Sequence, residues 1–381
     1  MKRSSQRILT THTGSLPRPD DLMELLRAKE AGEAFDAAAF ASRIKSTVAE
    51  TVRMQAAAGI DIVNDGEMSK PSYATYVKDR LAGFKGEKSA GLRAADLAEF
   101  PSFTKRGGRE TGVTVIRRPS CTGPITYRDR EAPRIDAENL RAALTGVKFE
   151  EAFISAASPG VVSFFLSDNY YNDHERYIRA IADAMKTEYE AIVAAGYILQ
   201  VDCPDLAMSR HIQFKDLSLT EFRKTIELHI DALNHALAEV PPDRSRLHLC
   251  WGNYEGPHHH DVALRDILDI VLKARPQGLS YEASNPRHEH EWTVFKDIKL
   301  PADKVLIPGV IDSVTNFVEH PELVAQRIEH LAGVVGRENV IAGTDCGFGT
   351  IAGVSRVDGA IAWAKLKSMA EGARIASSRL W

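Results

Sequence analysis

Three residues in two short motifs have the types and spacing of metal ligands. His248 and Cys250 lie two apart at the end of an apolar run, and Cys346 lies far downstream in the motif Thr344-Asp345-Cys346-Gly347. Side chains two apart on a β-strand point to the same side, so this pair could converge with a distant cysteine on one ion. Zinc prefers thiolate and imidazole ligands, and an open fourth position would make such a site catalytic rather than structural.

Each of these residues also has a simpler interpretation. A histidine and a cysteine at a strand end are often core residues, because cysteine is among the most buried residue types. Cys346, however, lies in a glycine-rich turn directly after a strand, where a thiol would be exposed rather than packed. We therefore predict a shared metal, with Glu282 as the fourth ligand, since an acid in a barrel mouth is costly unless it is paired or bound to a cation.

The remaining cysteines and histidines are weaker candidates. Cys121 and Cys203 have no histidine nearby in sequence, and we expect inert thiols that line a pocket. The run His258-His259-His260 resembles a metal site, but consecutive residues point in different directions and its flanks favour a solvated loop that enters a helix. His288 follows Glu282 on the functional face, where it could line the pocket and act in catalysis.

The elements that must position these residues alternate between short β-branched runs and longer helical stretches, which is typical of parallel strands with helical crossovers. Eight strands predict an α/β fold, a (β/α)8 barrel with insertions. The expected strands are Ile8–Thr10, Ile60–Asn64, Val113–Arg117, Ile198–Asp202, Arg246–Cys250, Leu279–Glu282, Val305–Pro308 and Val340–Ala342. The expected helices are Phe40–Ala58, His174–Ala195, Leu219–Glu239, Val262–Ala274, Glu322–Val335 and Gly359–Ser377.

Two segments fall outside this alternation. Val161–Leu166 is apolar and could be an extra strand or a buried loop. Residues 83–112 are rich in Gly, Lys, Glu and Arg, which predicts an insertion rather than a barrel element. No internal repeat is evident, so we predict one catalytic domain over residues 1–381.

Polar residues follow several predicted strands, at the end where barrel enzymes build their active sites. Glu67 follows Asn64-Asp65-Gly66, and Asp202 ends the run that begins at Tyr197. Asp202 could bind a substrate ammonium or hydroxyl group, or could only orient a loop. Glu67 is similar, with Lys70 and Arg80 nearby as salt-bridge partners that would make it structural.

Composition narrows the function classes. The chain has 48 Lys+Arg against 52 Asp+Glu, without the basic excess that nucleic acid or anionic membranes would select. The N-terminus lacks the apolar stretch of a signal peptide, and no run reaches the length of a membrane span, which predicts a cytoplasmic protein. Four cysteines are too few for a disulfide scaffold in 381 residues. The sequence is compatible with a homo-oligomer.

The motifs together resemble the cobalamin-independent methionine synthases and their relatives, zinc-dependent thiol alkyltransferases that include epoxyalkane:coenzyme M transferase. The likeness spans most of the chain. In that family zinc is held by a His-x-Cys strand end, a Glu on the next strand and a Cys in an Asp-Cys-Gly turn. These ligands fall here on His248, Cys250, Glu282 and Cys346. The resemblance also implies the (β/α)8 barrel.

The resemblance extends to the binding of an amino-acid thiol substrate. The family's Gly-Ser, Gly-Glu and Gln-Val-Asp motifs correspond to Gly14-Ser15, Glu67 and Asp202, and its Thr-Gly-Pro turn recurs at residues 122–124. Its Pro-Gly-Val-x-Asp strand end places a further catalytic candidate at Asp312. Where the family continues with a histidine thought to handle a proton, this chain has Ser313, so the proton step must differ.

The resemblance implies that zinc activates a substrate thiol as a thiolate, which then attacks an electrophilic carbon of the second substrate. Our first hypothesis is methyl transfer to homocysteine or a similar thiol. The chain is only as long as the catalytic half of folate-using synthases, so folate is a doubtful donor and a small or corrinoid donor is open. The second hypothesis is alkyl transfer from an epoxide to coenzyme M, with Arg18, Lys70 or Arg287 binding the sulfonate.

Two further alternatives come from other classes. A binding protein with a purely structural zinc predicts a saturated site, although structural zinc usually clasps short loops rather than strand ends. A metal-free decarboxylase on the same barrel, as in the uroporphyrinogen decarboxylase relatives, leaves His248, Cys250 and Cys346 unexplained.

Overall fold

A sheet of eight parallel strands forms the centre of the protein. The computed structural model describes residues 1–34, 36–86, 94–106, 117–354 and 356–381. The strand order is β1-β10-β9-β8-β7-β6-β5-β2. The strands are β1 (Leu9–Thr10), β2 (Ile62–Asn64), β5 (Glu151–Ala157), β6 (Ile198–Asp202), β7 (Ser245–Leu249), β8 (Gly278–Tyr281), β9 (Val305–Ile311) and β10 (Ile341–Thr344).

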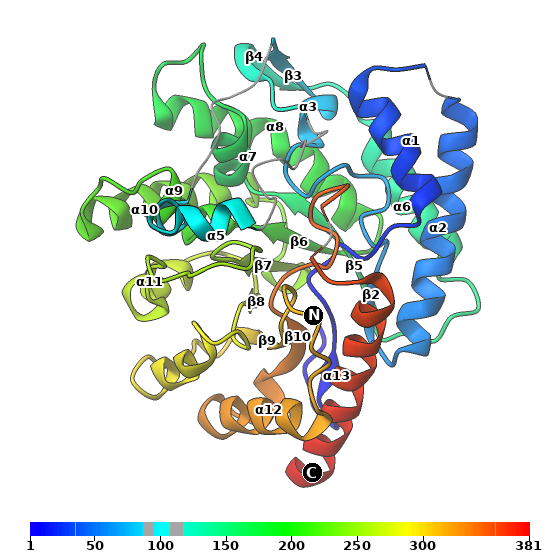
Figure 1. The fold of residues 1–381 in the computed structure, drawn as a ribbon, viewed down its shortest axis with the longest axis vertical. Coiled ribbons are helices and arrows are strands. Elements are labelled where there is room, and N and C mark those ends of the chain that lie inside the picture. The colour runs from blue at the N-terminus through cyan, green and yellow to red at the C-terminus, as the bar shows by residue number, and fades with distance from the viewer. Residues whose placement is uncertain (35, 87–93, 107–116, 355) are drawn as a thin grey trace.

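The two ends of this sheet meet. The Asp61 N–H donates to Thr10 O at 3.1 Å, and the Thr11 hydroxyl donates to Ile62 O at 3.1 Å, so contacts between β1 and β2 nearly close the barrel. Helices surround the strands (Figure 1). The predicted (β/α)8 barrel is confirmed.

The helices of the described residues begin at clear sequence signals. Helix α10 begins after Ser218, which forms a capping box with Glu221, and α8 begins after Asp173, whose carboxylate accepts the Arg176 N–H. The α-helices are α1 (Asp20–Ala31), α2 (Ala37–Ala57), α3 (Val77–Arg80), α4 (Ala95–Glu99), α5 (Pro101–Arg106), α6 (Glu131–Ala143), α7 (Pro159–Phe165), α8 (His174–Ala194), α9 (Ser209–Ile212), α10 (Leu219–Ala236), α11 (Leu264–Val271), α12 (Pro321–Val335) and α13 (Gly359–Leu380). Short 3₁₀ helices are η2 (Pro204–Leu206), η3 (Pro242–Arg244), η4 (Glu289–Lys296) and η5 (Arg337–Asn339).

One barrel strand differs from the prediction. Seven expected strands overlap observed ones, but β5 fills the position between β2 and β6. Of the expected strand Val113–Arg117, residues 113–116 lie outside the described residues, and Arg117 is not in a strand. The β5 sequence Glu-Ala-Phe-Ile-Ser-Ala-Ala has one β-branched aliphatic residue, so its propensity for a strand is weak. Pairing with β2 and β6 on its two sides holds it in place.

The apolar segment Val161–Leu166 is neither an extra strand nor a loop. It lies mostly within α7, which begins after Ser158, whose hydroxyl accepts the Val161 N–H at 2.9 Å. Pro159 occupies the first turn, where its missing N–H has no cost. The serine-proline start therefore outweighs the β-branched composition of the segment.

Cys121, which follows the expected strand Val113–Arg117, does not end a barrel strand. It lies in β4 (Ser120–Tyr127), which pairs antiparallel with β3 (Leu81–Lys85) in a separate two-stranded sheet. The predicted insertion, residues 83–112, includes the end of β3 and helices α4 and α5. Its residues 87–93 and 107–112 lie outside the described residues.

A buried arginine fills the barrel interior. The Arg246 guanidinium lies 3.5 Å from the centroid of the Phe153 ring and donates to Gln200 Oε1, Thr11 Oγ1 and the His12 carbonyl at 2.7 to 2.9 Å. This layer lies below the strand ends that carry the candidate ligands. Among helices of the described chain, none combines the length and apolar composition that crossing a bilayer demands.

Candidate metal and substrate site

Four donor side chains meet where β7, β8 and β10 end. Cys250 Sγ lies 3.0 Å from Cys346 Sγ, which lies 3.7 Å from His248 Nε2 and 3.5 Å from Glu282 Oε1. All four side chains are buried. Two sulfurs bound at about 2.3 Å to one tetrahedral ion would lie about 3.8 Å apart. The donor atoms of His248, Cys250 and Cys346 therefore lie within 4.8 Å of one another, as the ligands of one small ion would, and Glu282 lies beside them in contact with Cys346.

His248 is prepared to act as a neutral ligand. Burial and the neighbouring Arg246 charge lower the pKa of His248 to about 3, so its imidazole is uncharged at neutral pH. Its Nδ1 lies 3.2 Å from the Ser280 hydroxyl. Such a contact on one ring nitrogen fixes the ring orientation and leaves Nε2 directed at the two thiols.

The two thiols need a cation to ionise. The hydrogen bond to Cys346 lowers the pKa of Cys250, but burial and the Glu282 charge outweigh it and raise the value to about 12. Burial and the contact with Cys250 raise the pKa of Cys346 further. Because a metal ion favours thiolates, binding would release these protons. The donor set therefore fits zinc.

Asp345 orients the segment that follows Glu282. Its Oδ1 accepts the N–H groups of Ala283 at 2.8 Å and Ser284 at 2.9 Å. Burial and then the Glu282 charge raise the pKa of Asp345 to about 7. On the facing strand only glycine fits at Gly309, because a Cβ there would overlap the Asp345 carboxylate. The motif residue next to Cys346 thus positions a second candidate ligand.

A cavity lies beside the donor set, and two carboxylates line it. Glu67 and Asp202 line this cavity with His248, Cys250 and Cys346. Glu67 Oε2 is buried without a hydrogen-bond partner among the described residues. Burial and the charge of Glu67 raise the pKa of Asp202 well above its usual range. Two buried carboxylates, one with an unsatisfied oxygen, form a site that a cation would stabilise.

The backbone at Glu67 is strained to reach this position. Its φ is 57°, a left-handed conformation that a glutamate rarely adopts, and Asp65 Oδ1 accepts its N–H at 2.9 Å. Gly14 lies opposite with φ 140°, and a Cβ there would meet Glu67 Oε1 and Ser155 Oγ. Ser15 lines the cavity. Strain of this kind concentrates at functional sites.

The basic residues near these carboxylates are engaged elsewhere. Arg80 pairs with Glu188 and Asp136, and the Lys70 ammonium donates to the Ser155 carbonyl, so neither forms the salt bridge considered for Glu67. Arg18 donates to three backbone carbonyls, those of Gly349, Glu67 and Lys70. Within the described part of the chain, no lysine or arginine lines the cavity.

Asp312 lies outside the cavity lining. Its carboxylate accepts N–H groups of Val314 at 2.9 Å and Thr315 at 2.8 Å, and Lys365 Nζ lies 3.5 Å away. Burial opposes ionisation, but Lys365 and these hydrogen bonds hold the pKa of Asp312 below its usual value. The structure therefore places Asp312 in the turn after β9, and its catalytic role stays a prediction.

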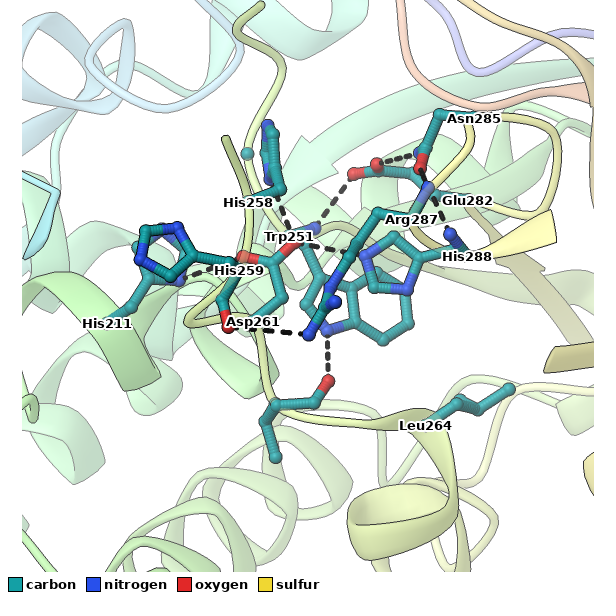
Figure 2. A network of polar contacts seen from close by, with 12 residues as sticks. His211, Trp251, His258, His259, Asp261, Leu264, Glu282, Asn285, Arg287 and His288 are labelled. Atoms are coloured by element: carbon teal, nitrogen blue, oxygen red, sulfur yellow. Dashed lines mark hydrogen bonds and ion pairs between the residues drawn. The ribbon is translucent and has the colours of Figure 1, made fainter. Parts of the chain in front are cut away.

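His288 also lies behind the site rather than in it. Its two ring nitrogens contact Glu291 Oε2 at 2.8 Å and Asp261 Oδ2 at 3.0 Å, and its ring stacks on Trp251 with centroids 4.1 Å apart. The backbone N–H of Trp251 in turn donates to Glu282 Oε1 at 2.8 Å. Figure 2 shows Trp251 against the His288 ring, with Glu282 close by. These contacts place His288 where it can position Glu282 and the Cys250 segment.

Replacing His288 with glutamine is expected to lower the free energy of unfolding by about 3 kcal/mol near pH 6, because two buried carboxylates lose their cation. Burial lowers the pKa of His288, but Asp261 and Glu291 outweigh it and raise the value to about 10. A raised pKa stabilises the fold fully below about 6.5, and this stabilisation is lost as pH rises toward about 10. Urea unfolding of H288Q and of the exposed control H290Q between pH 6 and 10 measures it. A difference that does not shrink with pH would contradict the imidazolium.

Several cavity residues were not predicted. Tyr73, Asn253 and Thr350 line the cavity from loops that follow β2, β7 and β10. Asn253 donates to Gly347 O at 2.9 Å and accepts the Ser313 hydroxyl at 2.9 Å, which ties the loops after β7, β9 and β10 together. Their position in loops after barrel strands is the signal that could have pointed to them.

The other two cysteines and the histidine run lie apart from the donor set. The Cys203 thiol is buried and donates to Val201 O at 3.5 Å, and Cys121 donates to Gly123 O in its hairpin. Neither lines the cavity described above, although both were expected to line a pocket. His258 stacks on Tyr254, whereas the neighbouring His259 and His260 are exposed, as expected for a solvated loop.

The fold and site together define a (β/α)8 barrel with thiol, imidazole and carboxylate donors at its strand ends. Residues 8–97 match the family model described as the catalytic domain of cobalamin-independent synthase. A methionine synthase of Saccharolobus solfataricus is 24% identical over 374 residues, which cover 97% of this chain and 95% of that protein. One of Sulfolobus acidocaldarius is 25% identical over 340 residues, covering 89% and 85%.

A solved structure has the same fold. The B12-independent methionine synthase of Shewanella sp. W3-18-1, in complex with selenomethionine, superimposes with a TM-score of 0.73 at 19% identity and covers 98% of this chain and 99% of that one. The resemblance predicted from the motifs is confirmed: residues 8–97 match the catalytic-domain model of the cobalamin-independent synthases, and most of the chain is similar to methionine synthases.

Proposed function

We propose that this protein is a zinc-dependent methyltransferase that transfers a methyl group to the thiol of homocysteine or a closely similar amino-acid thiol. One observation carries the proposal. A single cavity has a donor set suited to zinc on one side and two carboxylates, Glu67 and Asp202, on another. The similarity to proteins named methionine synthases agrees with this pairing.

His248, Cys250, Glu282 and Cys346 would hold the zinc. The ion would supply Lewis acidity, which keeps a substrate thiol deprotonated at neutral pH. Glu282 is the ligand best suited to give up its place, because its oxygens already have other partners. Oε1 accepts the Trp251 N–H at 2.8 Å, and Oε2 accepts from Asn285 Nδ2 at 2.9 Å. A displaced carboxylate would therefore keep its hydrogen bonds.

Glu67 and Asp202 would bind the substrate's ammonium group. Both carboxylates are buried, so leaving their charges unpaired is costly. A bound ammonium would reduce the repulsion between them and would donate a hydrogen bond to Glu67 Oε2. Orientation of the thiol toward the donor set follows from this anchoring, since the amine and thiol of one small molecule are fixed at two sides of the cavity. The carbon donor would then approach the sulfur from the barrel mouth.

The cavity disfavours coenzyme M as the acceptor. A sulfonate needs a cationic partner, whereas the described residues that line the cavity offer carboxylates. Arg18 and Lys70, considered as sulfonate ligands, are bound to backbone carbonyls. Arg287 is exposed and lines a neighbouring cavity at the mouth. Transfer from an epoxide to coenzyme M is therefore the alternative outcome of the test.

The test compares two thiols on one protein. Cobalt-substituted protein is titrated with homocysteine and with coenzyme M, and the thiolate-to-cobalt absorption is followed. We expect homocysteine to bind at least about 100-fold more tightly than coenzyme M, as judged by the spectral change. This difference is the effect of a desolvated charge pair. Methionine formation is then assayed with a folate, a corrinoid and a small sulfonium donor. No response to homocysteine, or preference for coenzyme M, would overturn the proposal.

A further inference from the structure

Two adjacent exposed histidines face a glutamate from a distant part of the chain. His259 Nε2 lies 2.9 Å from Glu99 Oε2, and His260 Nε2 contacts Glu99 Oε1. One donor atom from each residue lies within 4.8 Å of the others. Glu99 ends α4, whereas the histidines lie in the loop after β7, so two segments about 160 positions apart meet here.

Contacts below the cluster hold these two segments in place. Asp96, in the same helix as Glu99, is buried and accepts the Tyr254 hydroxyl at 2.6 Å and the His258 N–H at 2.9 Å. The Phe100 ring packs edge-on against His259 with centroids 5.7 Å apart. These contacts fix α4 against the loop after β7, so the three donor groups are already close together before an ion binds. Binding would therefore cost little conformational entropy.

We propose that Glu99, His259 and His260 form a second metal site, which binds a divalent transition ion such as Ni²⁺, Zn²⁺ or Cu²⁺. Two imidazoles suit these ions and a carboxylate can complete the set, whereas Mg²⁺ and Ca²⁺ prefer oxygen ligands throughout. Exposure of all three side chains leaves room for waters in the remaining coordination positions. The site differs from the cysteine site in having no thiol.

The carboxylate of the cluster is ready to bind a cation. Hydrogen bonds to His260 and then His259 lower the pKa of Glu99, so the carboxylate is charged throughout the physiological range. Coordination uses the neutral imidazole, so binding of an ion would depend on pH. An ion would replace the direct histidine to glutamate contacts.

The position of the cluster suggests what occupancy would do. The loop that carries His259 and His260 begins with Cys250 and Trp251, and the His259 carbonyl lies 3.4 Å from Arg287 Nη2 (Figure 2). A metal that joins Glu99 to this loop would stabilise the docking of α4 beside the barrel mouth. The proposal does not depend on the methyltransferase function.

The experiment measures metal binding directly. Zinc-loaded full-length protein, with its thiol site filled, is titrated with Ni²⁺ by calorimetry, and zinc release is monitored in the same sample. We expect one Ni²⁺ to bind without release of zinc, and at least about tenfold weaker binding in E99Q and in H260A, since each loses one ligand. H290A, which removes another exposed histidine, should bind as the parent does.

A second readout follows the scaffold. Ni²⁺ should slow amide hydrogen exchange in residues 95–105 and 251–261 of the parent protein, and should leave these rates unchanged in H260A. Equal Ni²⁺ affinity in the parent, E99Q and H260A would overturn the proposal and leave an ion pair only. Because the three residues are exposed, these variants should keep the parent's melting temperature, which checks that they fold.

Discussion

Replacing Cys346 with serine is expected to reduce bound zinc from about one equivalent to less than about a tenth, and to lower methyl transfer roughly 1000-fold or more. Cys346 Sγ is the donor atom that contacts the other three, lying 3.0 Å from Cys250, 3.7 Å from His248 and 3.5 Å from Glu282. A hydroxyl is a poor ligand for zinc at neutral pH because it does not ionise as a thiol does. Metal analysis and the rate of methionine formation measure the two effects.

The matched control is Cys121→Ser. Cys121 is equally buried but lies in the β3–β4 hairpin, where its thiol donates to Gly123 O at 3.3 Å, a bond that serine can also make. Zinc content and rate should therefore stay near those of the parent. A zinc-free C346S protein that still turns over would contradict the metal assignment, and loss of zinc in C121S would show that any buried cysteine change disrupts the site.

The sequence predicts the barrel because short β-branched runs alternate with longer helical stretches along most of the chain. Ile198–Asp202 is predicted and observed with the same bounds. The strands that precede the candidate metal ligands, β7, β8 and β10, have observed bounds that differ from the predicted ones by one or two residues. Strand β5 was not predicted because its alanine, serine and phenylalanine residues form no periodic pattern. Its identity as a strand depends on burial between β2 and β6, which is a property of the tertiary structure.

The metal donors could be predicted from the sequence, whereas several residues of the cavity lining could not. Thiol, imidazole and carboxylate groups at the ends of parallel strands must meet at one edge of the barrel, so sequence order suffices to bring them together. Asn253 and Tyr73 reach the cavity through loop conformations that the sequence does not encode in a short pattern. His288 was predicted as a candidate from its chemistry, but its two carboxylate partners, Asp261 and Glu291, can be identified only from the structure.

Replacing Glu67 with glutamine is expected to lower kcat/KM for homocysteine about 100-fold, mainly through KM. Removing one charge from a buried ion pair with the substrate ammonium typically costs about 3 kcal/mol. Glu67 Oε2 is buried and has no partner among the described residues, so its charge is reserved for a ligand. Zinc content should stay at the parent's value, because Glu67 is not among the metal donors. Initial rates at varied homocysteine concentration give the KM and kcat separately.

The same variant should be more stable than the parent when no substrate is bound. Burial, and next the charge of Glu67, raise the pKa of Asp202, because repulsion between the two carboxylates opposes ionisation of Asp202 in the buried cavity. Glutamine removes that repulsion and keeps the shape of the side chain, so the free energy of unfolding should rise by about 1 kcal/mol. Lower affinity with higher stability separates a binding role from a folding defect. A variant that binds homocysteine normally, or one that is less stable, would contradict the assignment of Glu67 to the ammonium group.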